Sequence, residues 1–166
     1  RIMRLDPGMA FGTGSHATTR MCLELMDVDG KDVIDVGCGS GILGITASKL
    51  GAKEVIMTDI DECAVTATEH NMELNGVKNC KVYLKNLLDD NSVKGDVIVC
   101  NIMAEVLIAF APKIGDNLKE NGVIILSGIL TDRKDKVRKA YEAAGFVMDD
   151  ETVKGEWAAM AFRKGV

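Results

Sequence analysis

From residue 31 onward, short runs of apolar residues alternate with stretches in which apolar residues recur every three or four positions. The runs predict buried strands, and the longer periodic stretches predict helices that cover a sheet with one face. Strands and helices that alternate in this way favour parallel pairing, since each crossover helix returns the chain to the same edge. We therefore expect an α/β fold: a doubly wound, mostly parallel seven-stranded sheet with helices on both faces and a C-terminal antiparallel hairpin.

Turn and capping residues set the expected ends of each element. Strands are expected at residues 32–36, 54–58, 81–84, 96–100, 123–126, 146–153 and 157–163. Helices are expected from Thr18 or Thr19 to about Asp29, and at 41–50, 61–75, 107–121 and 132–144. Within the fourth of these helices Pro112 is an interruption, and Ser127-Gly128 is expected to end the fifth strand.

Composition fits one globular domain of 166 residues. Apolar residues make up 47% of the chain, and no apolar run reaches the roughly 20 residues of a membrane-spanning helix. A net charge of −5 without a basic block disfavours direct nucleic-acid binding, which depends on phosphate neutralisation, and suits a basic partner. The five cysteines are scattered and only two histidines occur, so we expect no metal site, a cytoplasmic location and reduced, buried thiols.

Residues 33–44 join an apolar strand to a helix through a glycine-rich turn. Glycine at every second position lets the backbone approach a nucleotide-like ligand closely. Gly39-Ser40-Gly41-Ile42-Leu43-Gly44 fits the dinucleotide fingerprint of dehydrogenases, whereas Asp35-Val36-Gly37-Cys38-Gly39-Ser40-Gly41 fits the first motif of methyltransferases that use S-adenosylmethionine (SAM). We favour the second, because the strand ends before Gly37 and because Asp35 could face the ammonium group of a methionine moiety but would repel a pyrophosphate.

Three polar residues follow the next strands at the same edge of the predicted sheet. Asp59 ends the second strand, about 20 residues after the turn, where an acid can accept both hydroxyls of a ribose. Asn86 and Leu87 follow the third strand; the pair could hold the edge and face of an adenine, or form an ordinary loop. Asn101 ends the fourth strand, and its carbonyl oxygens suit an attacking amine.

In this order the pieces resemble the class I methyltransferase fold, which is Rossmann-like, and more closely the catalytic domain of the PrmA family, bacterial methyltransferases of ribosomal protein L11. The resemblance implies SAM as the cofactor, held by Thr19, Gly37, Asp59 and Asn101. Ala17 stands where the family commonly has proline, and Met103 where leucine is usual; neither change removes a chemical group. The matching segments are residues 5–16, 33–43, 59–61, Asn71 with Asn75-Gly76, 101–104, 126–129 and Glu156-Trp157.

The resemblance implies methyl transfer to lysine side chains and the terminal amine of a ribosomal protein. Two alternatives stay open: a methyltransferase of another protein or a small amine, and a non-catalytic SAM-binding module. A third alternative, a nicotinamide-dependent dehydrogenase, is less favoured by the motif than these two. Residues 1–166 are expected to form one methyltransferase domain, with a loop and helix at 1–30 and without the family's N-terminal substrate-recognition domain. Asn101 is the expected catalytic residue, and the expected cofactor-binding residues are Thr19, Asp35, Gly37, Gly39, Gly41, Asp59, Asn86 and Asn101.

Overall fold

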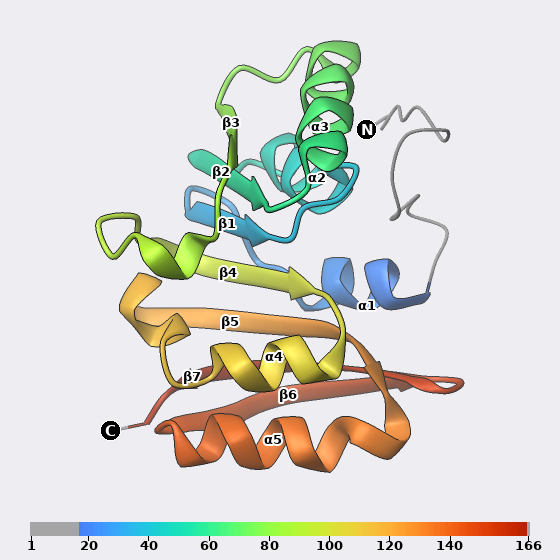
Figure 1. Cartoon of the computed structure of the whole chain (residues 1–166), viewed down its shortest axis with the longest axis vertical. Helices are drawn as coiled ribbons and strands as arrows, with labels where there is room; N and C mark the ends of the chain where they lie inside the picture. Colours follow the sequence, from blue (N-terminus) through green and yellow to red (C-terminus); the bar gives the residue numbers. More distant parts are fainter. Residues whose placement is uncertain (1–16, 166) are drawn as a thin grey trace.

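The computed structural model describes residues 17–165, in which helices pack on a central sheet (Figure 1). The loop predicted before Ala17 lies outside the described residues. The α-helices are α1 (Ala17–Leu25), α2 (Ile42–Lys49), α3 (Glu62–Asn75), α4 (Ala104–Phe110) and α5 (Lys134–Ala143). The strands are β1 (Asp32–Val36), β2 (Glu54–Asp59), β3 (Cys80–Leu84), β4 (Gly95–Asn101), β5 (Leu118–Leu130), β6 (Phe146–Lys154) and β7 (Trp157–Lys164). Short 3₁₀ turns are η1 (Leu87–Asp89), η2 (Ile114–Asn117) and η3 (Thr131–Arg133).

The strands form one seven-stranded sheet in the order β3-β2-β1-β4-β5-β7-β6. The first five strands of this order pair in parallel, and β7 is antiparallel to both β5 and β6. The predicted doubly wound, mostly parallel sheet with a C-terminal hairpin is confirmed. The strand order reverses between β1 and β4, and open α/β sheets bind ligands at the carboxyl ends of the strands beside such a reversal.

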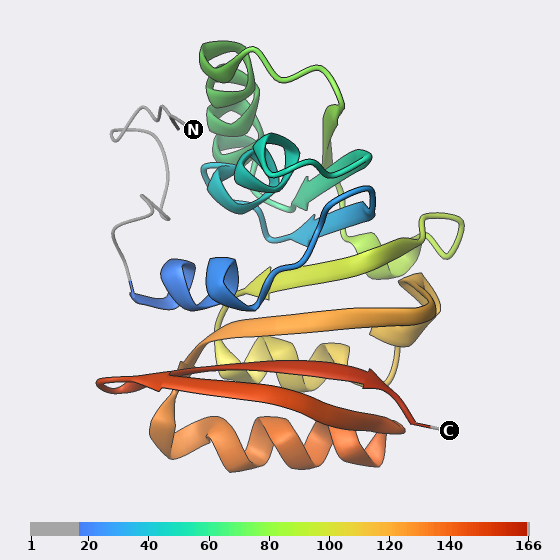
Figure 2. The same ribbon diagram turned by 180° about the vertical axis from the view of Figure 1, so that it is seen from behind.

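Successive residues of the central strands point to opposite faces and fill two separate cores. Val33 and Val97 pack in the core that α1 and α2 cover, whereas Ile34 and Ile98 pack in the core beneath α4 and α5. Helices α4 and α5 lie in front of the sheet in Figure 1, and α1 lies in front in Figure 2. Helices on both faces were expected. None of the helices within residues 17–165 is long and apolar enough to cross a membrane.

Two predicted boundaries after β4 are wrong. The expected helix at 107–121 stops as α-helix at Phe110, because Pro112 has no N–H to continue the ladder, and Leu118 already belongs to β5. Strand β5 continues to Leu130 instead of ending at Ser127-Gly128, although its pairing with β7 shifts register between Leu126 and Ile129. A bulge of this kind bends a strand without ending it.

The cysteines follow the expectation with one exception. Cys22, Cys38, Cys80 and Cys100 are buried, and Cys63 is exposed on α3. Burial raises the pKa of the Cys22 thiol to about 12, and it raises the pKa of the Cys100 thiol well above its ordinary value. These buried thiols therefore stay protonated at neutral pH and behave as small apolar side chains.

Candidate active site

The glycine-rich turn between β1 and α2 lies where the strand order reverses. Gly37, Gly39 and Gly41 all have positive φ, at 70°, 58° and 83°. A Cβ on Gly37 would lie 2.8 Å from Cγ2 of Ile102, which directly follows β4. Glycine at 37 thus allows both the left-handed conformation and the close approach of the turn to the end of β4.

Two polar residues of α3 hold the turn from its side. The Thr68 hydroxyl donates to the carbonyl oxygen of Gly39 at 3.0 Å, and Nδ2 of Asn71 donates to the carbonyl oxygen of Ser40 at 2.9 Å. Both side chains are fully buried. No role for Thr68 was predicted from the sequence. The signal that could have found it is a pair of polar residues, Thr68 and Asn71, three positions apart on the helix face that also buries Ala64 and Ala67.

Asp35 lies beneath the turn and is 2% exposed. Its Oδ2 accepts a hydrogen bond from the backbone N–H of Gly44 at 3.0 Å and so anchors the first turn of α2. Burial raises the pKa of Asp35 to about 7; the Gly44 hydrogen bond lowers it, and the charge of Asp59 raises it. A carboxylate can accept more than one hydrogen bond, so the Gly44 contact leaves room for a methionine ammonium, and that contact stays a prediction.

The carboxylate of Asp59 reaches the turn from the end of β2. Its Oδ2 accepts from the N–H of Gly39 at 3.0 Å, and its Oδ1 accepts from the N–H of Asp61 at 2.9 Å. The capping of α3 falls to Asp61, whose Oδ1 accepts from the N–H of Cys63 at 2.9 Å. A carboxylate offers about four lone-pair positions, so Asp59 keeps acceptor capacity for ribose hydroxyls.

Asn101 ends β4 in register with Ser127 of β5. Its Nδ2 donates to Oγ1 of Thr19 at 3.3 Å, while the Ser127 hydroxyl donates to the carbonyl oxygen of Thr18 at 2.8 Å. Two neighbouring strands, β4 at its last residue and β5 at Ser127, therefore hold the first turn of α1. The partners are 82 and 109 residues apart, so the sequence alone could not pair them.

Gly128 packs directly against this strand end. Its φ is 80°, and a Cβ there would lie 2.8 Å from the carbonyl oxygen of Ile102 and 3.1 Å from Oδ1 of Asn101. Since a backbone atom is involved, no rotamer change could relieve the overlap. Gly128 thus lets β5 approach Asn101 more closely than any other residue would.

Of the two residues predicted to contact adenine, Asn86 is exposed and Leu87 is buried. Asn86 is exposed two residues after the end of β3, one strand further from the turn than Asp59. The apolar face expected from Leu87 is wrong, because Leu87 is fully buried in the core beneath α4. Exposed apolar side chains at this edge are instead Ile60, 80% exposed after β2, and Leu84, 54% exposed at the end of β3.

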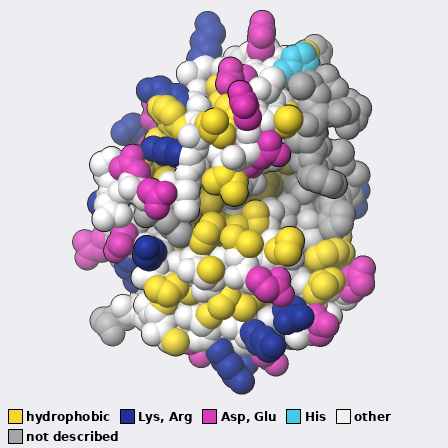
Figure 3. Space-filling view, viewed as in Figure 1, with side chains coloured by type: hydrophobic (Ala, Val, Ile, Leu, Met, Phe, Trp, Pro, Cys, Tyr) yellow, Lys and Arg dark blue, Asp and Glu magenta, His cyan; other side chains and the backbone are white. Residues whose placement is uncertain are grey.

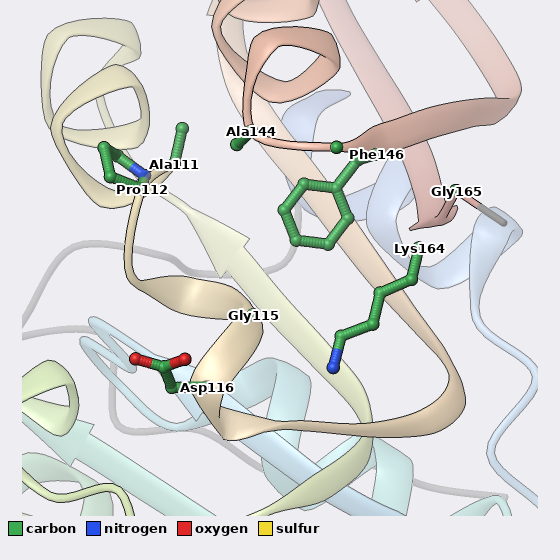
Figure 4. Close-up of a pocket in the computed structure, with 9 residues that line it drawn as sticks. Ala111, Pro112, Gly115, Asp116, Ala144, Phe146, Lys164 and Gly165 are labelled. Atoms are coloured by element: carbon green, nitrogen blue, oxygen red, sulfur yellow. The ribbon is translucent and has the colours of Figure 1, made fainter.

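A cavity of about 320 Å³ lies away from these residues (Figure 4). It is lined by Phe146, Lys164 and Asp116 among others, and it lies at the amino end of β5, the opposite edge from Asn101. The Lys164 ammonium donates to the carbonyl oxygen of Leu118 at 3.1 Å. The polar groups that meet at the glycine turn, Asp35, Asp59 and Asn101, therefore do not line this cavity.

Strand order, glycine turn, the acid after β2 and the polar residue after β4 together define a class I methyltransferase fold, which is Rossmann-like. The fold is shared with a tRNA methyltransferase of M. jannaschii at a TM-score of 0.81 and 21% identity, over 99% of this chain and 55% of that one. This chain belongs to the PrmA family: the family model for ribosomal protein L11 methyltransferase (PrmA) matches residues 1–165.

Relatives named ribosomal protein L11 methyltransferase support this membership. The chain is 48% identical to that of Thermoanaerobacter pseudethanolicus and 45% identical to that of Streptococcus pneumoniae, over 98% and 99% of its own length. A crystal structure of a ribosomal protein L11 methylase from Lactobacillus delbrueckii subsp. bulgaricus superposes with a TM-score of 0.94 at 40% identity, over 100% of this chain and 86% of that one. The chain spans about half the length of the two curated relatives, 54% and 53%.

Proposed function

We propose that this chain is the catalytic domain, over residues 1–166, of a cytoplasmic SAM-dependent methyltransferase. Its acceptors would be amines of a ribosomal protein, on lysine side chains and at the chain terminus. The observation that carries the proposal is the meeting of the glycine turn, Asp59 and Asn101 at the point where the strand order reverses. The names of the relatives supply the acceptor class.

The residue types at this edge support SAM as the ligand. Gly37, Gly39 and Gly41 present bare backbone to the ligand, and Asp59 offers carboxylate oxygens to a ribose. Asn86 is assigned the adenine edge, with Ile60 and Leu84 able to cover an adenine face. We assign Thr19 and Asn101 to the methionine end because they lie beside the turn, and we assign Asp35, the buried carboxyl group beneath the turn, to the methionine ammonium.

Asn101 is proposed as the catalytic residue, because it can orient an amine without adding charge. Its Nδ2 is engaged by Thr19, so its Oδ1 is the atom left to accept an N–H from the acceptor. When bound, SAM supplies a methyl group on a sulfonium sulfur. The chain's part is to hold the amine with its lone pair directed at that methyl group.

The acceptor amine must be neutral to react. A free lysine has a pKa near 10.4, so less than about 0.1% is neutral at pH 7. Burial of the acceptor side chain against the apolar residues around Asn101 would lower that pKa and raise the neutral fraction, as desolvation disfavours an ammonium. Positioning and desolvation, rather than a dedicated base, are therefore assigned most of the rate.

Calorimetry and methyl transfer test the proposal together. Titration with SAM should show one site per chain, and titration with NAD should show none, which separates the dehydrogenase alternative. Incubation with radiolabelled SAM and purified ribosomal protein L11, followed by mass spectrometry, should place methyl groups on amines. SAM binding without any transfer to a protein or a small amine would favour the non-catalytic alternative.

A further inference from the structure

Three exposed apolar residues follow Asn101 or its register partner Ser127 along the chain, at the carboxyl edge of the sheet. Met103 is 66% exposed, Leu130 is 40% exposed and Val106 is 38% exposed. Figure 3 shows hydrophobic side chains gathered on the face of the molecule that carries α4. We refer to Met103, Val106 and Leu130 as the apolar rim.

The residues of the apolar rim come from two neighbouring elements, α4 and β5. Met103 and Val106 are three residues apart at the start of α4 and therefore lie on one face of that helix. Glu105, between them, forms an ion pair with Arg133 at 3.7 Å. Arg133 belongs to η3, the turn that directly follows Leu130. The first turn of α4 and the end of β5 are thus neighbours.

Met103 lies at the N-cap of α4, where a residue with a capping side chain would stabilise the helix better. It makes no side-chain capping hydrogen bond. Ser, Thr, Asp and Asn are preferred there, because their oxygens accept from the free N–H groups of the first turn. An exposed methionine gives up that contribution, which points to a role for its apolar surface in contact with another molecule.

The charges around the rim are predominantly negative. The backbone N–H of Thr131 donates to the carbonyl oxygen of Glu156 at 2.9 Å, which brings Asp132 and Glu156 together beside Leu130. Within residues 17–165, neither carboxylate has a hydrogen bond or an ion pair. The nearby Lys134 and Lys154 already pair with carboxylates. Such a border favours a cationic partner and disfavours RNA or an anionic membrane.

The distance between the apolar rim and Asn101 suits the length of a lysine side chain. Leu130 is three residues beyond Ser127, the register partner of Asn101, and this corresponds to about 10 Å along the strand. A lysine whose amine reaches Asn101 has its backbone further out in the same direction. The residues that flank that lysine would then meet the rim.

We propose that the apolar rim, bordered by Asp132 and Glu156, docks the segment of the acceptor protein that carries the target lysine, a basic segment with apolar residues beside the lysine. This inference rests on the proposed function. It adds a recognition surface within this chain that is separate from the SAM-binding residues.

Binding of fluorescently labelled ribosomal protein L11, measured by anisotropy at saturating SAM, tests the rim without requiring turnover. Met103→Ser combined with Leu130→Thr should raise the dissociation constant about fivefold or more, with the dissociation constant for SAM unchanged. The melting temperature of Met103→Ser should be no lower than that of the wild type, because serine can cap α4. Leu74→Ser, at a similarly exposed leucine on α3, is the matched control and should change nothing.

The same binding assay at several salt concentrations tests the contribution of the acidic residues Asp132 and Glu156. Asp132→Asn with Glu156→Gln should weaken binding and flatten its dependence on salt. Unchanged L11 binding in both double variants, or no L11 binding by the wild type, would overturn the docking surface. So would tighter binding of a labelled RNA, or a dimer in sedimentation that Met103→Ser abolishes. Failure of the proposed function is distinct: it would appear as no SAM binding or no methyl transfer.

Discussion

Nδ2 of Asn101 donates a hydrogen bond to Oγ1 of Thr19 at 3.3 Å and so joins the end of β4 to the first turn of α1. This bond fixes which side of the amide faces α1. Oδ1 consequently lies on the other side, next to Gly128, where a Cβ would be 3.1 Å away. The orientation of the proposed catalytic amide thus depends on a residue far away in the sequence.

Removal of either partner should lower turnover. Asn101→Ala should reduce kcat at saturating SAM by about 100-fold, with a much smaller loss of SAM affinity, because the contact to the amine belongs mainly to the transition state. Thr19→Val should reduce kcat about tenfold, since Nδ2 then lacks its acceptor. Thr19→Ser should retain most of the activity. Methyl-transfer kinetics check all three variants.

A variant that combines Thr19→Val with Asn101→Ala distinguishes a positioning role of Thr19 from a general loss of structure. If Thr19 acts through Asn101, Thr19→Val should cost little further activity in an Asn101→Ala background. Fully additive losses, or an Asn101→Ala variant with near wild-type turnover, would contradict the assigned roles.

Asp59→Ala should weaken SAM binding by about 1.5–3 kcal/mol through the loss of charge-assisted hydrogen bonds to the ribose. The control is Asp61→Ala, which removes the cap of α3 and should cost about 1 kcal/mol of stability while leaving SAM affinity within about twofold of wild type. Calorimetry measures both affinities. Equal affinities for Asp59→Ala and the wild type would remove Asp59 from the ribose site.

Asp35 should make stability depend on pH. Its folded-state pKa of about 7 is above its ordinary value, so the folded protein binds the proton more tightly than the unfolded chain. The stabilisation from protonated Asp35 is complete near pH 4 and is lost as the pH rises through about 7. Relative to Asp35→Asn, the free energy of unfolding of the wild type should fall by about 1–2 kcal/mol between pH 5.5 and 7.5.

Chemical denaturation at several pH values gives these free energies. The Asn variant can still accept the Gly44 N–H, so the hydrogen bond at the turn is retained as a matched feature. Parallel pH profiles for the two proteins would show that Asp35 does not titrate in this range.

Gly128→Ala should destabilise the fold more than Gly155→Ala. Both glycines have positive φ, and a Cβ at Gly155 meets nothing within 4 Å, so that variant bears only the backbone cost of about 1 kcal/mol. At Gly128 the overlap with the Ile102 carbonyl oxygen should add about 1–3 kcal/mol. Thermal and chemical unfolding compare the two; equal losses would show that β5 can move away from Asn101.

The sequence by itself determined the order of strands and helices, the hairpin and the glycine turn. These features depend on local signals: hydrophobic period, capping residues such as Asp61 and Gly76, and glycines in the left-handed region. It also placed Asp59 and Asn101 correctly at strand ends, since the carboxyl ends of parallel strands share one edge. Where local signals were mixed, as from Pro112 to Gly128, the predicted boundaries failed.

Only the tertiary structure decided which side chains meet. It paired Asn101 with Thr19 and Ser127 with Thr18, buried Leu87, and brought Thr68 to the turn. It also kept β5 intact through Ser127-Gly128, because Ser127 still pairs with Asn101 of β4 and pairing with β7 resumes at Ile129. Contacts between residues 29 to 109 positions apart depend on how the sheet is packed and on which atoms remain to be hydrogen-bonded there. No periodicity within a short window of sequence contains that information.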